Sequence, residues 1–226
     1  MNIKVIIPAR NEQDSIGKVI TEIPDLVSEV IVVDNASGDK TAEVAKAAGA
    51  TVLTEMRKGY GSACLKGIQY LKGLTETIDI VVFMDADYSD YPEETALVVD
   101  PIIAYSYDLV IGSRVLGQRE KGSMTYPQVF GNQLATSLLR WLYGVQFTDL
   151  GPFRAIKFDK LKQIEMRDTN FGWTVEMQLK AAKKGLRCTE VPVRYRKRIG
   201  VSKVSGTVKG TFMAGYKILY TIFRYL

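Results

Sequence analysis

Two carboxylates separated by a single residue, Asp85 and Asp87, directly follow an apolar run at residues 80–84. A run of this length bounded by polar residues is typical of a buried parallel strand. Because side chains alternate along a strand, both acids are predicted to point the same way at its carboxyl end, where open α/β sheets bind ligands. Paired carboxylates at that edge suit a divalent cation, which in turn suits a diphosphate. An isolated Asp-Ala-Asp is more simply a solvated turn, so other residues must decide.

Two further charged residues end predicted strands in the same half of the chain. Asp34 ends an apolar run that begins at residue 29, and Arg114 ends one that begins at residue 108. Each of them, taken alone, is best explained as solvated surface. The carboxyl ends of parallel strands meet at one sheet edge, so their convergence with Asp85 and Asp87 predicts a site for a charged ligand.

The composition limits the chemistry that such a site can perform. The 226 residues include no histidine, which excludes a catalytic triad with histidine, a histidine base and a histidine-ligated zinc site. The two cysteines, Cys64 and Cys188, are far apart and lack metal-ligand spacing, so we interpret them as core residues in a reducing compartment. Chemistry must therefore rest on carboxylates, Arg, Lys, hydroxyl groups, the backbone and a metal ion.

The elements that would position these residues alternate between strand and helix over residues 1–115. This order predicts an α/β fold with a parallel, doubly wound sheet. The predicted strands span 2–8, 29–34, 51–54, 79–87 and 108–114, and the predicted helices span 14–27, 41–48, 58–73 and from 92 onward. Later residues predict a mobile loop at 117–126, a helix at 129–142, mixed short strands at 150–166, a helix from about 171 to 185 and an edge strand at 188–195.

The C-terminal end is basic and amphipathic. The chain carries a net charge of +5, and residues 186–226 contain nine Lys or Arg and one acid, so this end meets anionic partners such as phosphates or lipid headgroups. Residues 205–226 have helical spacing, and their apolar face consists of Val208, Phe212, Tyr216, Leu219, Phe223 and Leu226. Three charges across this stretch argue against a membrane span. A helix lying in a membrane interface and a helix docked on the sheet both remain open.

Five short segments occur in an order that resembles a known family. They are residues 8–12 (PARNE), 32–41 (VVDNASGDKT), 58–61 (KGYG), 85–87 (DAD) and 112–114 (GSR). This order is similar to that of the GT-A glycosyltransferases of family 2. Residues 149–155 and 196–203 are most similar to polyprenyl-phosphate sugar synthases of the dolichol-phosphate mannose synthase type. The resemblance implies a mostly parallel GT-A sheet flanked by helices. It divides the chain into a catalytic domain at 1–203 (nucleotide-binding half 1–115, acceptor-binding half 116–203) and a C-terminal amphipathic helix at 204–226.

The resemblance also implies roles for individual residues. The nucleotide would be held by Pro8, Ala9, Arg10, Glu12, Asp34, Lys58, Asp85 and Ala86. Mg²⁺ or Mn²⁺ would be bound by Asp87 and Asp85, which with Arg114 would form the catalytic group. Phosphate or acceptor would be bound by Arg114, Asp149, Arg196, Arg198, Ser202 and Lys203. The implied reaction is an inverting, metal-dependent transfer of a sugar from a UDP- or GDP-sugar to a polyprenyl phosphate.

Several alternatives stay open at this point. Ser89 stands where the related synthases usually have Gln, so either Asp90 or water would complete the metal shell. An acceptor phosphate needs no strong base, whereas a hydroxyl acceptor (glycolipid or small metabolite) would need Asp90, Glu93 or Asp149 as one. A non-enzymatic basic module on a membrane surface is a third reading. We expect no nucleic-acid partner and a cytoplasmic protein peripheral to the cytosolic face of a membrane. The sugar, the base and the oligomeric state, a homo-oligomer included, are left undetermined.

Overall fold

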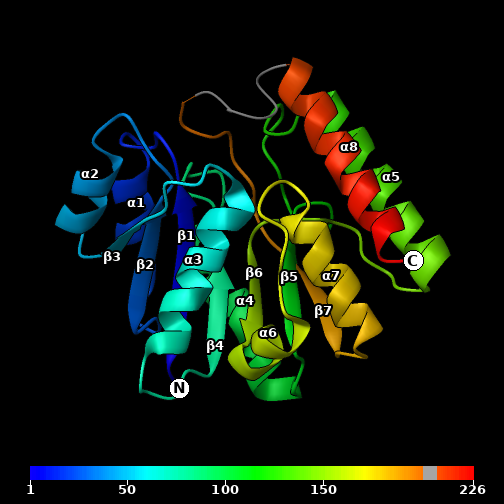
Figure 1. The fold of residues 1–226 in the computed structure, drawn as a ribbon, viewed down its shortest axis with the longest axis horizontal. Coiled ribbons are helices and arrows are strands. Elements are labelled where there is room, and N and C mark those ends of the chain that lie inside the picture. Colours follow the sequence, from blue (N-terminus) through cyan, green and yellow to red (C-terminus); the bar gives the residue numbers. More distant parts are fainter. Residues whose placement is uncertain (201–207) are drawn as a thin grey trace.

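The computed structural model describes residues 1–200 and 208–226, and over these ranges the chain forms one seven-stranded sheet covered by helices (Figure 1). The strands lie in the order β3-β2-β1-β4-β6-β5-β7. Their bounds are β1 (Ile3–Ala9), β2 (Glu29–Asp34), β3 (Thr51–Thr54), β4 (Ile80–Phe83), β5 (Leu109–Ser113), β6 (Arg154–Lys157) and β7 (Cys188–Pro192). The predicted strands of the first half are therefore all present.

One strand breaks the parallel order that residues 1–115 predict. β6 lies between β4 and β5 and runs antiparallel to both, so that Ala155 pairs with Val82 on one side and Val110 on the other. β4 and β5 are thus not neighbours, and the sheet is mostly rather than wholly parallel. β7 lies at the sheet edge, as predicted from Pro192, which has no N–H to donate to a further strand.

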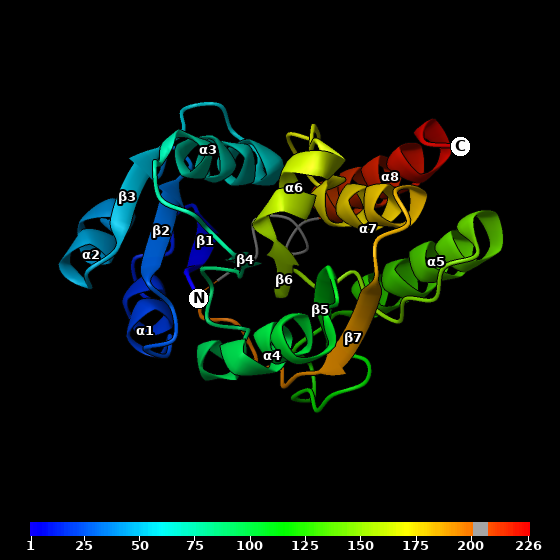
Figure 2. The same cartoon turned by 90° about the horizontal axis from the view of Figure 1, so that it is seen from below.

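Helices cover both faces of the sheet (Figure 2). One layer contains α1 (Ile16–Thr21), α2 (Thr41–Ala47) and α4 (Thr95–Tyr105), and the other contains α3 (Tyr60–Gly73), α6 (Phe158–Ile164) and α7 (Trp173–Lys183). A short 3₁₀ turn, η1 (Pro92–Glu94), precedes α4. α1 ends six residues before the predicted limit of 27, and α6 lies where the sequence predicts mixed short strands. Each layer encloses its own apolar core, because successive residues of β1 such as Ile6 and Ile7 point to opposite faces.

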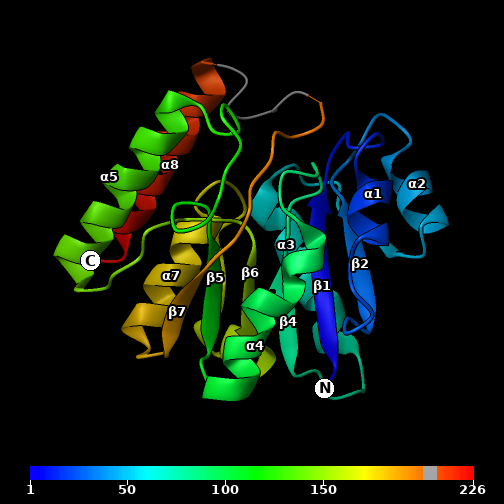
Figure 3. The same ribbon diagram turned by 180° about the vertical axis from the view of Figure 1, so that it is seen from behind.

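Two long helices lie side by side beyond the β7 end of the sheet (Figures 1 and 3). They are α5 (Tyr126–Tyr143) and α8 (Val208–Arg224). α8 is amphipathic as predicted, but it packs on α5 and α7 rather than on the sheet: Ile222 is buried there and its carbonyl accepts a hydrogen bond of 2.6 Å from the Tyr143 hydroxyl. Phe212 and Phe223 of the predicted apolar face are exposed. None of the helices in the described ranges is long and apolar enough to cross a bilayer.

Glu176 of α7 fastens the loop that precedes this helix. Its buried carboxylate accepts hydrogen bonds from the Asp168 N–H (2.7 Å), the Tyr225 hydroxyl (2.7 Å) and the Lys180 ammonium (2.8 Å). Burial alone would raise the pKa of Glu176, but these donors outweigh burial and lower the pKa below its usual value of 4.5. The same loop accepts a hydrogen bond of 3.0 Å from the Ser62 N–H through the Thr169 carbonyl, so Glu176 indirectly positions the start of α3.

We expect Glu176→Gln to lower the free energy of unfolding at pH 7 by about 2–4 kcal/mol, because it removes a buried charge on which four donors converge, the Arg167 N–H being the fourth. A depressed folded-state pKa gives stability that is present above the unfolded pKa and is lost as pH falls through the folded one. The difference in the free energy of unfolding between wild type and variant should therefore become smaller below about pH 4.5. Urea unfolding from pH 3.5 to 7 measures it, with exposed Glu165→Gln as control. A gap that does not change with pH would contradict the assignment.

Candidate functional site

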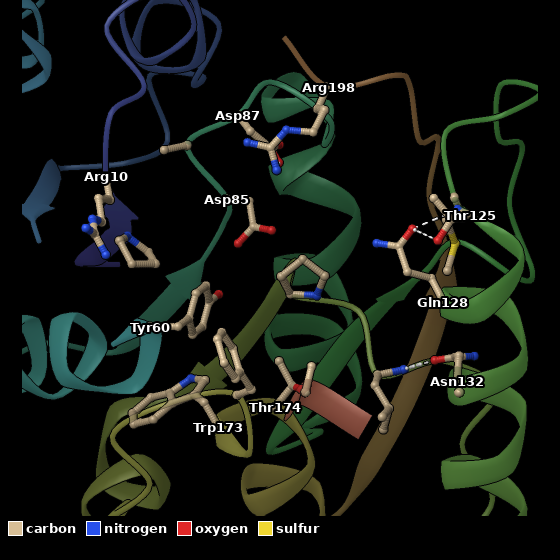
Figure 4. A pocket seen from close by; sticks show the side chains of 18 of the residues that line it. Arg10, Tyr60, Asp85, Asp87, Thr125, Gln128, Asn132, Trp173, Thr174 and Arg198 are labelled. Carbon is tan, nitrogen blue, oxygen red and sulfur yellow. Dashed lines mark hydrogen bonds and ion pairs between the residues drawn. The ribbon is translucent and has the colours of Figure 1, made fainter. Parts of the chain in front are cut away.

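A cavity of about 860 Å³ opens at the carboxyl ends of β1 and β4 and extends to α5 and α8 (Figure 4). Most of the predicted site residues line it. These are Pro8, Ala9, Arg10, Glu12, Lys58, Asp85, Ala86, Asp87, Arg114 and Arg198. They come from both predicted halves of the chain, 1–115 and 116–203, so the cavity lies where the two halves meet.

The acid pair lies on a turn and not within a strand. β4 ends at Phe83, two residues before Asp85, so strand alternation does not set the directions of these side chains. The turn itself does: Tyr88 has a φ of 66°, and the N–H of Ser89 donates to Asp87 Oδ1 at 3.0 Å, as does the Ser89 hydroxyl. Ser89, at the position where related synthases usually have Gln, thus fixes the rotamer of Asp87.

Three carboxylates crowd this turn. Burial, and then repulsion from Asp87, raise the pKa of Asp85 to about 7, and burial with repulsion from its neighbours raises that of Asp90 well above the usual range. Asp85 Oδ1 and Asp90 Oδ1 are buried and have no hydrogen-bond partner within the described part of the chain. Asp90 Oδ2 accepts the Asp85 N–H at 3.3 Å. Three buried acids on one turn repel one another, so the cluster favours a bound cation.

The acid pair satisfies what a divalent ion needs when a diphosphate is also bound. Within the described ranges, no three Asp, Glu or Cys side chains are arranged to hold a metal by themselves. Mg²⁺ is usually bound through one or two carboxylates together with substrate phosphates. Asp85 and Asp87 supply the carboxylates, and both side chains line the cavity that would contain the phosphates (Figure 4).

Asp34 lies just behind the cavity wall rather than in it. Its side chain is buried and its Oδ1 has no hydrogen-bond partner among the described residues, so a donor from a ligand would be accommodated. The neighbouring Asn35, to which sequence reasoning gave no role, lines the cavity. Its amide donates to the carbonyls of Glu55 and Arg57 at 2.9 Å, and its oxygen accepts the Gly59 N–H at 2.8 Å. Asn35 therefore holds the loop that carries Lys58.

Gly59 allows this loop to approach residues 168–170. It has a φ of 146°, and a Cβ there would lie 2.2 Å from the Thr169 carbonyl oxygen. No other residue type fits both conditions. The close approach brings Tyr60 into the cavity wall, where its hydroxyl is buried without a hydrogen-bond partner in the described ranges.

Arg114 and Asp149 form a buried fork. The guanidinium donates from Nε to Asp149 Oδ2 at 2.8 Å and from Nη2 to Oδ1 at 2.7 Å, and the Arg114 N–H also donates to Oδ2. Burial alone would lower the pKa of Arg114, but Asp149 outweighs burial and raises it. The Asp149 side chain is fully buried, and both of its oxygens are engaged. We expected Asp149 to contact phosphate directly or to act as a general base. This geometry instead favours a role in which Asp149 positions Arg114.

The two arginines expected to bind phosphate differ in position. Arg198 lines the cavity, whereas Arg196 lies outside it. The Arg196 guanidinium donates to the Tyr88 carbonyl at 2.7 Å and to Glu22 at 3.0 Å, and it stacks on the Tyr88 ring. Arg196 thus supports the Asp87–Asp90 turn from behind, and it lies outside the cavity in which we expect the phosphates. Ser202 and Lys203 lie outside the described residues.

The predicted half 116–203 contributes several cavity residues that sequence reasoning did not assign. Trp173, Thr174, Thr125, Gln128 and Asn132 line it. The Asn132 amide donates to the Thr148 carbonyl and its oxygen accepts the Leu150 N–H, each at 2.9 Å, which ties α5 to the segment that contains Asp149. A Pro and a possible N-cap at the start of a helix mark residues 125–128 in the sequence, but their spacing does not reveal that they face Asp85 across a cavity.

A mostly parallel α/β sheet with a cavity at its carboxyl edge, and paired acids on the turn after the central strand, defines a GT-A-like fold. The chain belongs to glycosyl transferase family 2, whose family model matches residues 4–165. It is 34% identical over 216 residues to an uncharacterized glycosyltransferase of Mycobacterium tuberculosis, covering 94% of each chain. It is also 31% identical over 223 residues to the undecaprenyl-phosphate mannosyltransferase of Micrococcus luteus, covering 93% of this chain and 90% of that one.

A solved structure confirms the fold. Glucosyl-3-phosphoglycerate synthase from Mycobacterium tuberculosis, in complex with Mn²⁺, UDP-glucose and phosphoglyceric acid, superposes with a TM-score of 0.79 at 22% identity. The match covers 99% of this chain and 79% of that one. The predicted GT-A fold and the predicted membership of a glycosyltransferase family are therefore confirmed.

Proposed function

We propose that this glycosyltransferase moves a sugar from a UDP- or GDP-sugar to a polyprenyl phosphate, with inversion at the anomeric carbon and with Mg²⁺ or Mn²⁺ bound. The observation that carries the proposal is the composition of the cavity. One end holds the acid pair and Arg114, and the other reaches apolar and small residues of α8, namely Ala214, Gly215 and Ile218. A charged end joined to an apolar end fits a substrate that has a phosphate head and a prenyl tail.

At the donor end of the cavity, each charged group would have a role in binding the substrates. Asp34 would accept an N–H of the uracil or guanine base through its orphaned oxygen. Arg10 and Lys58 would lie along the diphosphate, and Asp85 and Asp87 would hold the metal ion. The bound metal would act as a Lewis acid that stabilises the leaving nucleoside diphosphate. Arg114, held rigid by Asp149, would orient the acceptor phosphate, which is already an anionic nucleophile and needs no base.

The surface next to the apolar end fits a lipid environment. α5 exposes Tyr126 (93%) and Trp141 (79%), and α8 exposes Phe212 (74%). Large exposed apolar side chains gathered on neighbouring elements are characteristic of membrane or protein contact sites. The relative from Micrococcus luteus is named for an undecaprenyl-phosphate acceptor. We infer that α5 and α8 rest on a membrane surface, which would place the protein peripherally at the cytosolic face.

A small phosphorylated metabolite is the second candidate acceptor. The structural neighbour described above is a synthase that was solved with phosphoglyceric acid. In this chain Thr125, Gln128 and Asn132 give the α5 wall of the cavity polar groups that could meet a small polar acceptor. Residues 124–131 contain no Lys or Arg, so this wall offers no side-chain cation to the phosphate of either candidate acceptor. We rank the polyprenyl phosphate first because the cavity also reaches the apolar and small residues of α8.

A thermal-shift panel of UDP, GDP and dTDP, each with and without Mn²⁺, tests the donor end. A ligand that binds only the folded state raises the melting temperature. At 100 times its Kd, it adds about 2.7 kcal/mol to the free energy of unfolding. We expect a metal-dependent shift with UDP or GDP. No shift with any of the three diphosphates would overturn the proposed donor site.

The acceptor is then tested with the matching radiolabelled sugar donors. We expect labelled product with undecaprenyl phosphate in mixed micelles and none with 3-phosphoglycerate or with undecaprenol, which lacks the phosphate. Product with 3-phosphoglycerate alone would replace the first candidate by the second.

A further inference from the structure

Arg198 occupies the position next to Asp87 where a metal ion would be expected. Its Nη1 lies 2.9 Å from Asp87 Oδ2, and its Nη2 donates to Glu12 Oε1 at 2.8 Å. Figure 4 shows the guanidinium beside Asp87 at the rim of the cavity. We propose that Arg198 is the internal counter-ion of the metal site: a divalent ion displaces it from Asp87, and it then binds the diphosphate that arrives with the metal. The proposal deepens the donor site and rests on the proposed function.

Displacement follows from the saturation of Asp87. Oδ1 already accepts the Ser89 N–H and hydroxyl, and Oδ2 faces the Arg198 guanidinium. A cation that binds Oδ2 needs the space and the lone pairs that Nη1 now uses, and two positive charges at that distance repel. A metal ion and the present position of Arg198 are therefore mutually exclusive at this oxygen.

The backbone next to Arg198 is fixed, so its side chain is the part that moves. Residues 195–199, which we call the strap, run along the Asp87–Asp90 turn. The Ile199 N–H donates to the Asp87 carbonyl and the Arg196 N–H to the Ser89 carbonyl, each at 2.9 Å. Arg196 anchors the strap from behind through Tyr88 and Glu22. A guanidinium on such a base can swing by rotamer changes while remaining at the rim of the cavity.

Arg198 also has one donor that is not in use. Its Nε is buried and has no hydrogen-bond partner among the residues that the structure describes. Arginine forms bidentate hydrogen bonds to phosphate oxygens, so a diphosphate next to Asp87 would satisfy the guanidinium after its displacement. Metal alone and Arg198 therefore compete, whereas metal and diphosphate together cooperate with Arg198. A counter-ion therefore weakens the binding of metal alone and strengthens the binding of metal with diphosphate, whereas an ordinary phosphate ligand would only strengthen the latter. Such an effect is a coupling between two binding events.

Arg198→Gln tests the proposal without any turnover assay. Free Mn²⁺ measured by electron paramagnetic resonance gives the metal affinity in the absence of nucleotide, and calorimetry gives the UDP or GDP affinity at saturating Mn²⁺. We expect Mn²⁺ alone to bind about 10-fold more tightly than in wild type, and the nucleotide about 10-fold more weakly. Arg194→Gln is the matched control, because Arg194 belongs to the neighbouring backbone but pairs with Glu93 and Glu94 outside the cavity. It should change neither affinity.

Each possible result either supports or overturns the counter-ion role of Arg198. An Arg198→Gln protein that binds Mn²⁺ no more tightly than wild type, yet binds nucleotide more weakly, would reduce Arg198 to a phosphate ligand and overturn the counter-ion role. A gain in Mn²⁺ affinity that persists when Asp87→Asn is added would place the metal elsewhere and overturn it too. If neither protein bound any nucleotide, the proposed donor site would fail while the Mn²⁺ measurement still reported on Arg198. Arg198→Lys, which reaches only one carboxylate, should give an intermediate Mn²⁺ affinity and serves if the Gln variant does not fold.

Discussion

Asp87→Asn should lower kcat on the order of 10³-fold or more while leaving the protein folded, because it removes a charge that we propose holds the metal ion on the leaving diphosphate. Asparagine has nearly the same shape, and its oxygen can still accept the Ser89 N–H that now binds Asp87 Oδ1 at 3.0 Å. The substitution also relieves the repulsion that contributes to the raised pKa of Asp85. Loss of function without loss of stability is therefore expected.

Two measurements check this result. The transfer rate at saturating donor reports kcat, and the Mn²⁺-dependent thermal shift with UDP or GDP reports binding. The transfer rate and the Mn²⁺-dependent thermal shift should both be almost lost in Asp87→Asn, whereas the melting temperature without ligand should stay within a few degrees of wild type. Asp159→Asn is the control, because Asp159 lies exposed on α6 with a side chain that is 65% accessible. Turnover at the wild-type rate by Asp87→Asn would remove this residue from the metal site.

Local patterns in the sequence were sufficient to predict which acidic residues lie at the carboxyl edge of the sheet. Asp34 directly ends its strand, so its place at the sheet edge follows from the strand itself. Asp85 and Asp87 were also placed correctly at that edge, although the physical reason was different. The strand stops at Phe83, and a turn stabilised by Ser89 aims the acids. The position of a residue at the sheet edge depends on chain order, which can be read from the sequence. The direction of its side chain depends on turn geometry, which cannot.

Contacts between distant segments account for what the sequence did not reveal. β6 has only four residues, and its position depends on pairing with β4 and β5 from far along the chain. Arg196 and Arg198 are two residues apart and equally basic, yet only the strap's pairing with the Asp87–Asp90 turn decides which one faces the cavity. The same holds for α8: helical periodicity found its apolar face, but packing on α5 and α7 used Ile222 instead and left Phe212 and Phe223 exposed.

Asp149 holds Arg114, which we propose orients the acceptor, so experiment must separate a positioning role of Asp149 from a catalytic one. We expect Asp149→Ala to lower the free energy of unfolding by about 3–5 kcal/mol, because it leaves the Arg114 guanidinium buried without its partner. The Arg114 side chain is only 11% accessible and makes both arms of its fork with this one carboxylate. The transfer rate should fall as well, since Arg114 would no longer be held toward the acceptor phosphate.

A comparison of stability and pH dependence distinguishes positioning from base catalysis. If Asp149 positions Arg114, urea unfolding will show the large loss of stability, and the remaining activity will keep the pH profile of the wild type. If Asp149 also acts as a general base, the acid limb of the pH–rate profile will disappear as well. Glu93→Ala is the matched control, because it breaks an exposed pair with Arg194 (3.0 Å), for which about 0–1 kcal/mol is expected. A loss at Asp149 no larger than the loss at Glu93 would contradict the buried fork as the element that fixes Arg114.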